Sequence, residues 1–122
     1  MTVRNINDVD HQPVGLAGAD RVAMALMVGR EHGAPHFALR HFNVERDGHT
    51  PHHQHDYEHE VFIVSGTGTL HLDGSDHPLK AGDVAYVPAD TDHQFRADSG
   101  TGLSFLCLVP VERNCGGDTP GS

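Results

Sequence analysis

Short runs of alternating apolar and polar residues fill most of the chain, and residues typical of turns separate them. Successive side chains of a strand point to opposite faces, so this alternation is typical of half-buried β-strands. Residues 21–28 contain alanines and methionines that would also suit a helix, and we prefer a strand there. The pattern predicts strands at residues 21–28, 36–45, 59–64, 67–72, 83–87, 93–97 and 103–110, with a further short strand that ends near residue 79.

Turn-forming residues lie between these strands. Residues 46–48 (Arg-Asp-Gly) predict a turn, and residues 73–75 (Asp-Gly-Ser) predict another. Ser65 and Gly66 predict a tight connection of the kind that hairpins use. At least eight closely spaced strands with no convincing helix indicate an all-β barrel or sandwich of antiparallel strands.

A length of 122 residues fits one domain. We expect an N-terminal arm at residues 1–20, where no clear periodicity is present, a barrel at residues 21–112 and a flexible C-terminal tail at residues 113–122. At this size folding buries only about 65% of the surface of the unfolded chain. The small core therefore favours a homodimer, which we expect to form through the N-terminal strands.

The formal charge of −9 and eight scattered basic residues argue against a nucleic-acid partner. No apolar run approaches the roughly 20 residues that span a bilayer, so we expect no membrane partner. The first ten residues are polar and acidic, unlike a signal peptide, and we expect a soluble cytoplasmic protein. Cys107 lies in an apolar strand and Cys115 in the Gly-rich tail, a pattern that indicates neither a disulfide framework nor a thiolate zinc site.

The chemistry is concentrated in residues 48–66, which hold five of the twelve histidines. By strand alternation His53 and His55 can point the same way, and His59 shares a face with the apolar residues that follow it at alternate positions. His49 and His52 lie off these positions, and we interpret both as loop residues. Neutral imidazole binds manganese, iron, nickel, copper and zinc, so the stretch predicts a divalent metal site.

Two segments carry a resemblance to a known family. Residues 48–66, GHTPHHQHDYEHEVFIVSG, resemble the first motif of the cupin superfamily, which reads Gly, five residues, His-x-His, three or four residues, Glu, six residues, Gly. Residues 82–97, GDVAYVPADTDHQFRA, resemble the second motif. The resemblance implies a double-stranded β-helix, or jelly-roll, fold for the barrel.

The motifs also differ from the usual cupin pattern. His59 occupies the position of the usual glutamate, four residues rather than five separate Gly48 from His53, and Asp90 and Ala97 replace a glycine and an asparagine. The chain is thus similar to small single-domain cupins that have a four-histidine site. For this chain the resemblance implies one divalent metal ion bound by His53, His55, His59 and His93.

Four neutral ligands would leave the metal its full positive charge and make it a strong Lewis acid. Similarity to the four-histidine group favours a redox-capable metal, so manganese and iron are our first choices, while the geometry also admits nickel, copper or zinc. We expect Asp56, Glu58 or Glu60 as candidate acceptors for the second ring nitrogens. Alternation, however, turns both glutamates away from the face of His59.

Strand alternation predicts the orientation of the other pocket residues. We expect Phe105 and Cys107 to face inward beside the metal and Tyr86 to pack. The charge of Arg40 lies either at the barrel mouth, where it could hold a substrate carboxylate or phenolate, or on the solvent face. No serine, cysteine or lysine has a basic partner at a recognisable spacing, so the sequence does not favour nucleophilic catalysis.

The predicted function is that of a metal-dependent, dioxygenase-like oxidoreductase, which would activate dioxygen or peroxide toward a small unsaturated or aromatic substrate. One alternative is a non-redox metal enzyme, an isomerase or polyketide-cyclase-like protein, in which the metal polarises a carbonyl. Another is a non-catalytic cupin that binds a small molecule. Fold alone does not decide among these functions, because cupins support many chemistries.

Overall fold

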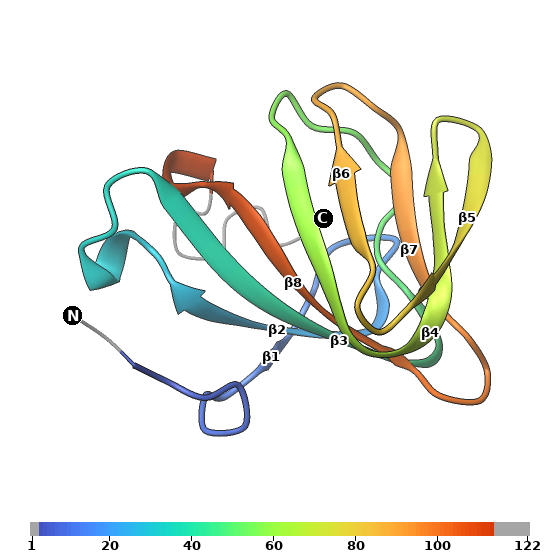
Figure 1. The fold of residues 1–122 in the computed structure, drawn as a ribbon, viewed down its shortest axis with the longest axis horizontal. Helices are drawn as coiled ribbons and strands as arrows, with labels where there is room; N and C mark the ends of the chain where they lie inside the picture. Colours follow the sequence, from blue (N-terminus) through green and yellow to red (C-terminus); the bar gives the residue numbers. More distant parts are fainter. Residues whose placement is uncertain (1–2, 114–122) are drawn as a thin grey trace.

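The computed structural model describes residues 3–113, and these residues form an all-β structure (Figure 1). Short 3-10 turns, η1 (Arg30–His32) and η2 (Val111–Arg113), are the helical elements of this range, and neither approaches the length or apolar character of a membrane-crossing helix. Residues 114–122, which include most of the predicted flexible tail and Cys115, lie outside the described residues. The strands are β1 (Gln12–Pro13), β2 (Asp20–Val28), β3 (Phe37–His49), β4 (His59–Leu72), β5 (Ser75–Lys80), β6 (Val84–Val87), β7 (His93–Ala97) and β8 (Leu103–Pro110).

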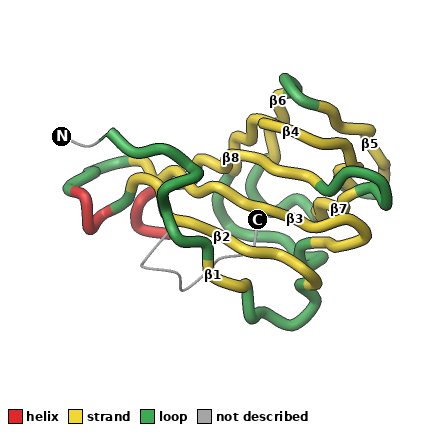
Figure 2. The backbone as a smooth tube through the Cα atoms, turned by 90° about the horizontal axis from the view of Figure 1, so that it is seen from below, coloured by secondary structure: helices red, strands yellow, loops and turns green. Residues whose placement is uncertain are grey.

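Antiparallel pairing closes the sheet into a barrel. Strand β8 pairs with β3 on one side and with β4 on the other, while β7 pairs with β4 and meets β3 at His49 and Arg96. The cycle β3–β8–β4–β7 therefore returns to β3. Strands β5 and β6 pair with β4, and β2 extends the sheet from β3 with β1 at its edge (Figure 2). The predicted jelly-roll barrel is confirmed, and so is the choice of a strand at residues 21–28.

The predicted hairpin at Ser65 and Gly66 is wrong, because β4 continues through both residues. Before this point β4 pairs with β6 and β8, and after it with β5 and β7. Gly66 has a φ of 83°, and a Cβ atom there would lie 2.2 Å from the carbonyl oxygen of Gly102. Glycine thus lets a single strand bend between two sets of partners, which is the role of a bulge rather than of a turn.

The predicted turn at residues 46–48 is also part of a strand. Asp47 has a φ of 64°, and the register between β2 and β3 shifts between Asp20 and Val22. The local conformation that turns require therefore occurs here as an irregularity inside β3. Because β3 continues to His49, it delivers the chain directly to the histidine-rich segment.

The barrel interior follows strand alternation. Alternate residues of β8 are buried, and on β3 the residues from Ala38 to Val44 that share its inner face are buried with them. Phe105 stacks on Phe42 at a centroid distance of 5.1 Å and on Phe95 at 4.6 Å. All three rings are fully buried, so this aromatic stack forms part of the barrel core.

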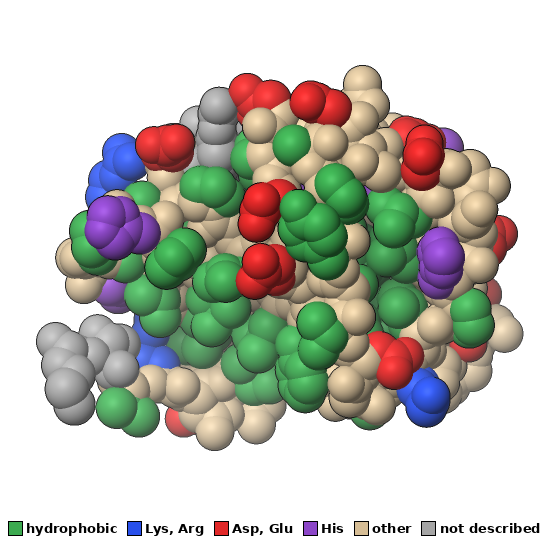
Figure 3. Space-filling model, turned by 45° about the horizontal axis from the view of Figure 1, so that its top comes forward, with side chains coloured by type: hydrophobic (Ala, Val, Ile, Leu, Met, Phe, Trp, Pro, Cys, Tyr) green, Lys and Arg blue, Asp and Glu red, His purple; other side chains and the backbone are tan. Residues whose placement is uncertain are grey.

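The outer face of the barrel carries exposed apolar side chains, and Figure 3 shows apolar residues gathered across one face of the molecule. The most exposed large ones on strands are Phe37, Phe62, Val84 and Tyr86. Tyr86 is 54% exposed, so our expectation that it packs is wrong. Its side chain lies on the outer side of β6 because Val87, its neighbour, takes the inner side.

Candidate metal centre

Four histidines converge where the segment between β3 and β4 meets the start of β7. His59 is the first residue of β4 and His93 the first of β7. His53 forms an isolated β-bridge with His93, in which each backbone N–H donates to the carbonyl of the other residue, at 3.1 and 2.9 Å. This backbone bridge holds the two imidazoles side by side, and His55 follows on the same side of the segment.

The ring distances describe one compact group. The ligand atoms of His53, His55 and His93 all lie within 4.8 Å of one another. The ring centroid of His59 lies 5.1 Å from those of both His55 and His93. His59 therefore lies against the group of three, and the four residues that the sequence singled out come together in space.

Burial differs across the group. His59 and His93 are buried, whereas His53 and His55 are only partly covered. The group therefore opens toward solvent on the side of the segment that carries His53 and His55. A ligand would enter from that side, because the aromatic stack fills the other.

Two of the imidazoles are held through Nδ1. The Nδ1–H group of His93 donates to the carbonyl oxygen of Thr91 at 2.9 Å, which leaves the lone pair of the neutral ring on Nε2. Nδ1 of His59 lies 3.2 Å from Sγ of Cys107. Glu58 and Glu60, which we considered for this role, are exposed instead. A backbone carbonyl and a thiol therefore orient these two rings. The carbonyl had no signal in the sequence, whereas Cys107 was expected beside the metal but not as the partner of His59.

The chemistry of the donor set fits a divalent transition metal. Nε2 of His59 is buried and makes no hydrogen bond with any residue in the described range. A buried polar atom without a hydrogen bond costs about 1–3 kcal/mol, so such an atom calls for a ligand. Imidazole nitrogens at these separations are suitable ligands for borderline metals.

The electrostatics keep His59 in its neutral form. Burial lowers its pKa from 6.5 to about 2, and the nearby positive charge of Arg40 and the other three imidazoles contribute further. Metals bind the neutral form of imidazole. At neutral pH this side chain is therefore ready to bind a metal without first losing a proton.

Arg40 lies inside the barrel, so its placement on the solvent face is wrong. Its side chain is 1% exposed, Nη2 donates to Sγ of Cys107 at 3.3 Å, and the guanidinium lies 5.1 Å from the ring centroid of Phe42. The alternation that buries Phe42 also turns Arg40 inward. The inner wall thus presents a positive charge beside the histidines, deeper than the rim position that the sequence suggested.

The inward orientation of Phe105 and Cys107 is confirmed, since both side chains are fully buried. Burial raises the pKa of the Cys107 thiol, although the charge and the hydrogen bond of Arg40 act in the opposite direction. The sulfur therefore joins Arg40 to His59 as a neutral thiol rather than as a nucleophilic thiolate.

Tyr57 is a further residue of the site. Its ring stacks on that of His55 at 4.7 Å and 10°, and the side chain is 9% exposed. The stacking fixes the plane of the His55 ring on the open side of the group.

A second network lies on the outer face of the sheet. His41 contacts Oγ of Ser104 through Nε2 at 2.9 Å and Nε2 of His11 through Nδ1 at 2.8 Å. Burial, together with His11, lowers the pKa of His41 to about 4. Ser104 therefore has a histidine partner that is 63 positions away, which no spacing in the sequence indicated.

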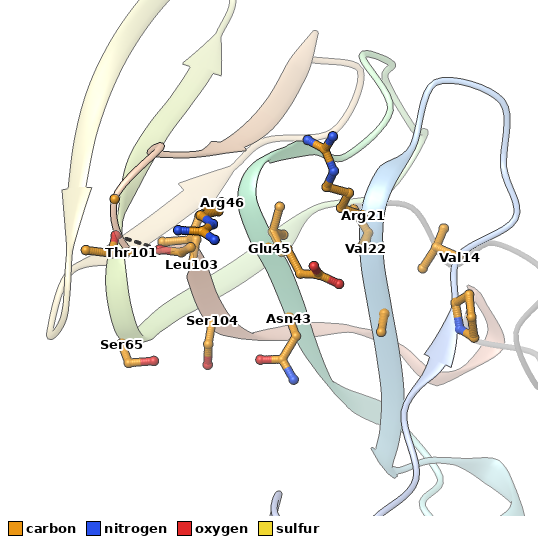
Figure 4. Close-up of a pocket in the computed structure, with 15 residues that line it drawn as sticks. Val14, Arg21, Val22, Asn43, Glu45, Arg46, Ser65, Thr101, Leu103 and Ser104 are labelled. Atoms are coloured by element: carbon orange, nitrogen blue, oxygen red, sulfur yellow. Dashed lines mark hydrogen bonds between the residues drawn. The ribbon is translucent and has the colours of Figure 1, made fainter.

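A surface hollow lies apart from the histidines. It has a volume of about 750 Å³ and lies where Asn43, Ser65 and Ser104 occupy neighbouring positions on β3, β4 and β8 (Figure 4). None of the four clustered histidines lines it. Its lining also includes Arg21, Glu45 and Arg46, and among the described residues it contains no histidine or cysteine.

Comparisons with known proteins identify the family of the chain. The chain is 34% identical over 76 residues to the 1-methylthio-D-xylulose 5-phosphate methylsulfurylase of Rhodospirillum rubrum, which covers 62% of this chain and 49% of that protein. It is 42% identical over 59 residues to the quercetin 2,3-dioxygenase of Bacillus subtilis, which covers 48% of this chain and 18% of that protein. The chain thus spans about half of the first relative and less of the second.

Among solved structures, the polyketide cyclase RemF from Streptomyces resistomycificus superposes with a TM-score of 0.86 and 28% identity. That superposition covers 91% of this chain and 80% of the other. The model of the cupin domain family matches residues 40–109, which is more than half of the chain. All four clustered histidines lie within the matched residues. On this match and the barrel topology, the chain belongs to the cupin family.

Proposed function

We propose that the chain is a metal-dependent enzyme that binds its cation through His53, His55, His59 and His93 and promotes a non-redox cyclisation of a small poly-β-carbonyl substrate. The observation that carries this proposal is the charge of the interior, where a guanidinium lies beside four imidazoles. Neutral ligands cancel none of a cation's charge, so the site favours an oxygen atom that becomes negative.

A divalent cation bound by the four histidines would act as a Lewis acid that polarises a substrate carbonyl. Residues of the chain would then stabilise the developing charge and hold the ligands in position. The guanidinium of Arg40 adds a fixed positive charge that stabilises an enolate or phenolate oxygen. Cys107 holds Arg40 and His59 at their positions.

The aromatic residues exclude water from the closed side. Phe42, Phe95 and Phe105 form a continuous stack behind the histidines. In a site shielded from water, charges act more strongly on a developing anion than they do in solution. The half-buried side with His53 and His55 is left for the entry of the substrate.

The similarity to a polyketide cyclase supports a non-redox reaction, because it extends over 91% of this chain. A dioxygenase-like reaction is the second candidate. It is supported by the 42% identity to quercetin 2,3-dioxygenase, within a match of 59 residues. Manganese or iron would suit that second reaction, whereas zinc, nickel or copper would also serve the first.

One experiment separates the two candidates. Untagged protein is loaded separately with zinc, manganese and iron and assayed against linear poly-β-carbonyl compounds, with and without dioxygen. We expect turnover with zinc under anaerobic conditions, without oxygen uptake. The enolate carbon would attack a second carbonyl of the same molecule to form a C–C bond, and the hydroxyl group left on that carbon would leave as water, so the product should be lighter by one water molecule. Turnover that needs both a redox metal and dioxygen would instead establish the dioxygenase candidate.

We also propose a homodimer, although through the outer faces of β4 and β6 rather than through the N-terminal strands that the sequence led us to expect. The exposed apolar residues on the outer strands, such as Phe62 and Val84, would be buried by a second copy of the chain. A small barrel gains core area in this way. Sedimentation equilibrium of the wild type and of F62E would test it, since a charge in the interface should shift the protein toward the monomer.

A further inference from the structure

A second cluster of metal-ligating side chains lies on the outside of the barrel wall. The geometry points to a separate zinc-type site formed by His52, His71 and Asp92, with Asp76 as the residue that positions His71. The ligand atoms of the first three residues all lie within 4.8 Å of one another. None of the three belongs to the inner group of histidines.

The topology explains why the two sites do not mix. His53 and His93 face inward across their backbone bridge, so their chain neighbours His52 and Asp92 face outward together. Strand β4 pairs with β7 so that Leu72 lies opposite His93, which places His71 on the outer side. The backbone N–H of Asp73 donates to the carbonyl of Asp92 at 2.8 Å and joins the two turns.

The distances suit a tetrahedral cation. Nε2 of His52 lies 2.6 Å from Oδ2 of Asp92, and Nε2 of His71 lies 3.8 Å from the same oxygen. Ligand atoms around a zinc ion lie about 3.4 Å apart, given bonds of about 2.0–2.2 Å. The separation of His71 from Asp92 is close to this value, whereas the 2.6 Å contact of His52 is a hydrogen bond from its ring N–H that a bound cation would replace after side-chain rotation. Water would take the remaining position.

Asp76 provides a second hydrogen-bond partner for His71, which distinguishes the cluster from a simple ion pair. Nδ1–H of His71 donates to Oδ1 of Asp76 at 2.9 Å across the β4–β5 hairpin. This bond places the lone pair of the neutral ring on Nε2, the atom that faces Asp92. A carboxylate behind a ligating imidazole is the usual second partner of a zinc-bound histidine.

Two histidines and one carboxylate select a borderline divalent cation, with zinc as the natural probe. The donor set differs from the inner one because it contains a negative charge, which stabilises the bound cation. A cation here would join the segment that precedes His53 to strands β4 and β7. It would therefore brace the entrance of the inner site from outside.

The test is zinc binding by untagged, metal-free protein, measured by equilibrium dialysis. We expect two zinc ions per chain for the wild type and one fewer for H71A and for the isosteric D92N. D76N should keep the second zinc ion but bind it about 10–100-fold more weakly. H77A is the matched control, because His77 is an exposed histidine on β5 outside the cluster, and it should bind zinc as the wild type does.

A second background separates this site from the inner one. H55A/H59A should retain one zinc ion, and adding H71A should remove it, whether or not the inner histidines bind a metal in the wild type. If H71A and D92N, each with a native circular dichroism spectrum, bind as much zinc as their parents at the same affinity, the outer site does not exist.

Discussion

The two sides of one backbone bridge present histidines in opposite environments. Inside the barrel, His59 and His93 are buried against aromatic residues and a guanidinium, and the pKa of His59 falls to about 2. Outside, His52 and His71 contact carboxylates and remain partly exposed to solvent. Neighbouring residues of one segment thus belong to two different clusters of side chains, because strand alternation places them on opposite sides of the barrel wall.

The difference has a consequence for cation binding. The inner donors are neutral, so a bound cation would keep its charge for a substrate, whereas Asp92 neutralises part of the charge outside. The inner group thus suits catalysis and the outer group suits bracing.

The largest effect should come from the packing of the interior. F105A removes the fully buried ring between Phe42 and Phe95 and should lower the free energy of unfolding by about 3–5 kcal/mol. F62A, at a partly exposed outer position, should change it by no more than about 0.5 kcal/mol in the monomer. Urea denaturation measures both, and equal losses would contradict the division into an inner and an outer face.

R40Q should lower the rate of the metal-loaded enzyme by about 100–1,000-fold, because a positive group aimed at a developing oxyanion is lost. Metal content, measured by elemental analysis, should stay as in the wild type. A loss of metal equal to the loss of rate would mean that Arg40 acts on the ligands and not on the substrate.

H59A should weaken the binding of the inner metal by at least about 100-fold, since loss of a ligand should cost no less than loss of a residue that orients one. Dialysis followed by elemental analysis measures the occupancy, with H77A as the control. Full metal occupancy in H59A would show that this histidine is not a ligand and that His53, His55 and His93 alone bind the metal.

A further prediction concerns the pH dependence of stability and involves His41 on the outer face. Its pKa is about 4 in the folded chain and about 6.5 when unfolded, so the unfolded state binds more protons between these values. Stability should fall as the pH is lowered from 6.5 toward 4, by up to about 1.4 kcal/mol per pH unit. H41Q, measured by urea denaturation at several pH values, should flatten this dependence relative to the wild type. Because His11 contacts His41, an H11Q variant measures how much His11 contributes to the lowered pKa of His41.

Several expectations failed for related reasons. Gly66 and the segment around Asp47 have the local chemistry of turns, yet both lie within strands. A residue with positive φ can end a strand or bend it, and only the partners available on either side decide between the two. The expectation for Tyr86 failed for a similar reason, because strand alternation does not show whether another element covers the outer face of β6.

The sequence by itself determined the all-β barrel, the inward faces of Phe105 and Cys107, and the grouping of His53, His55, His59 and His93, since alternation and two motifs are local patterns. Only the tertiary structure decided what these residues contact. The buried position of Arg40, the link through Cys107 to His59, and the contacts of His71 with Asp92 and of His41 with Ser104 join residues far apart in the chain. Such contacts depend on strand pairing and register, which no local spacing encodes.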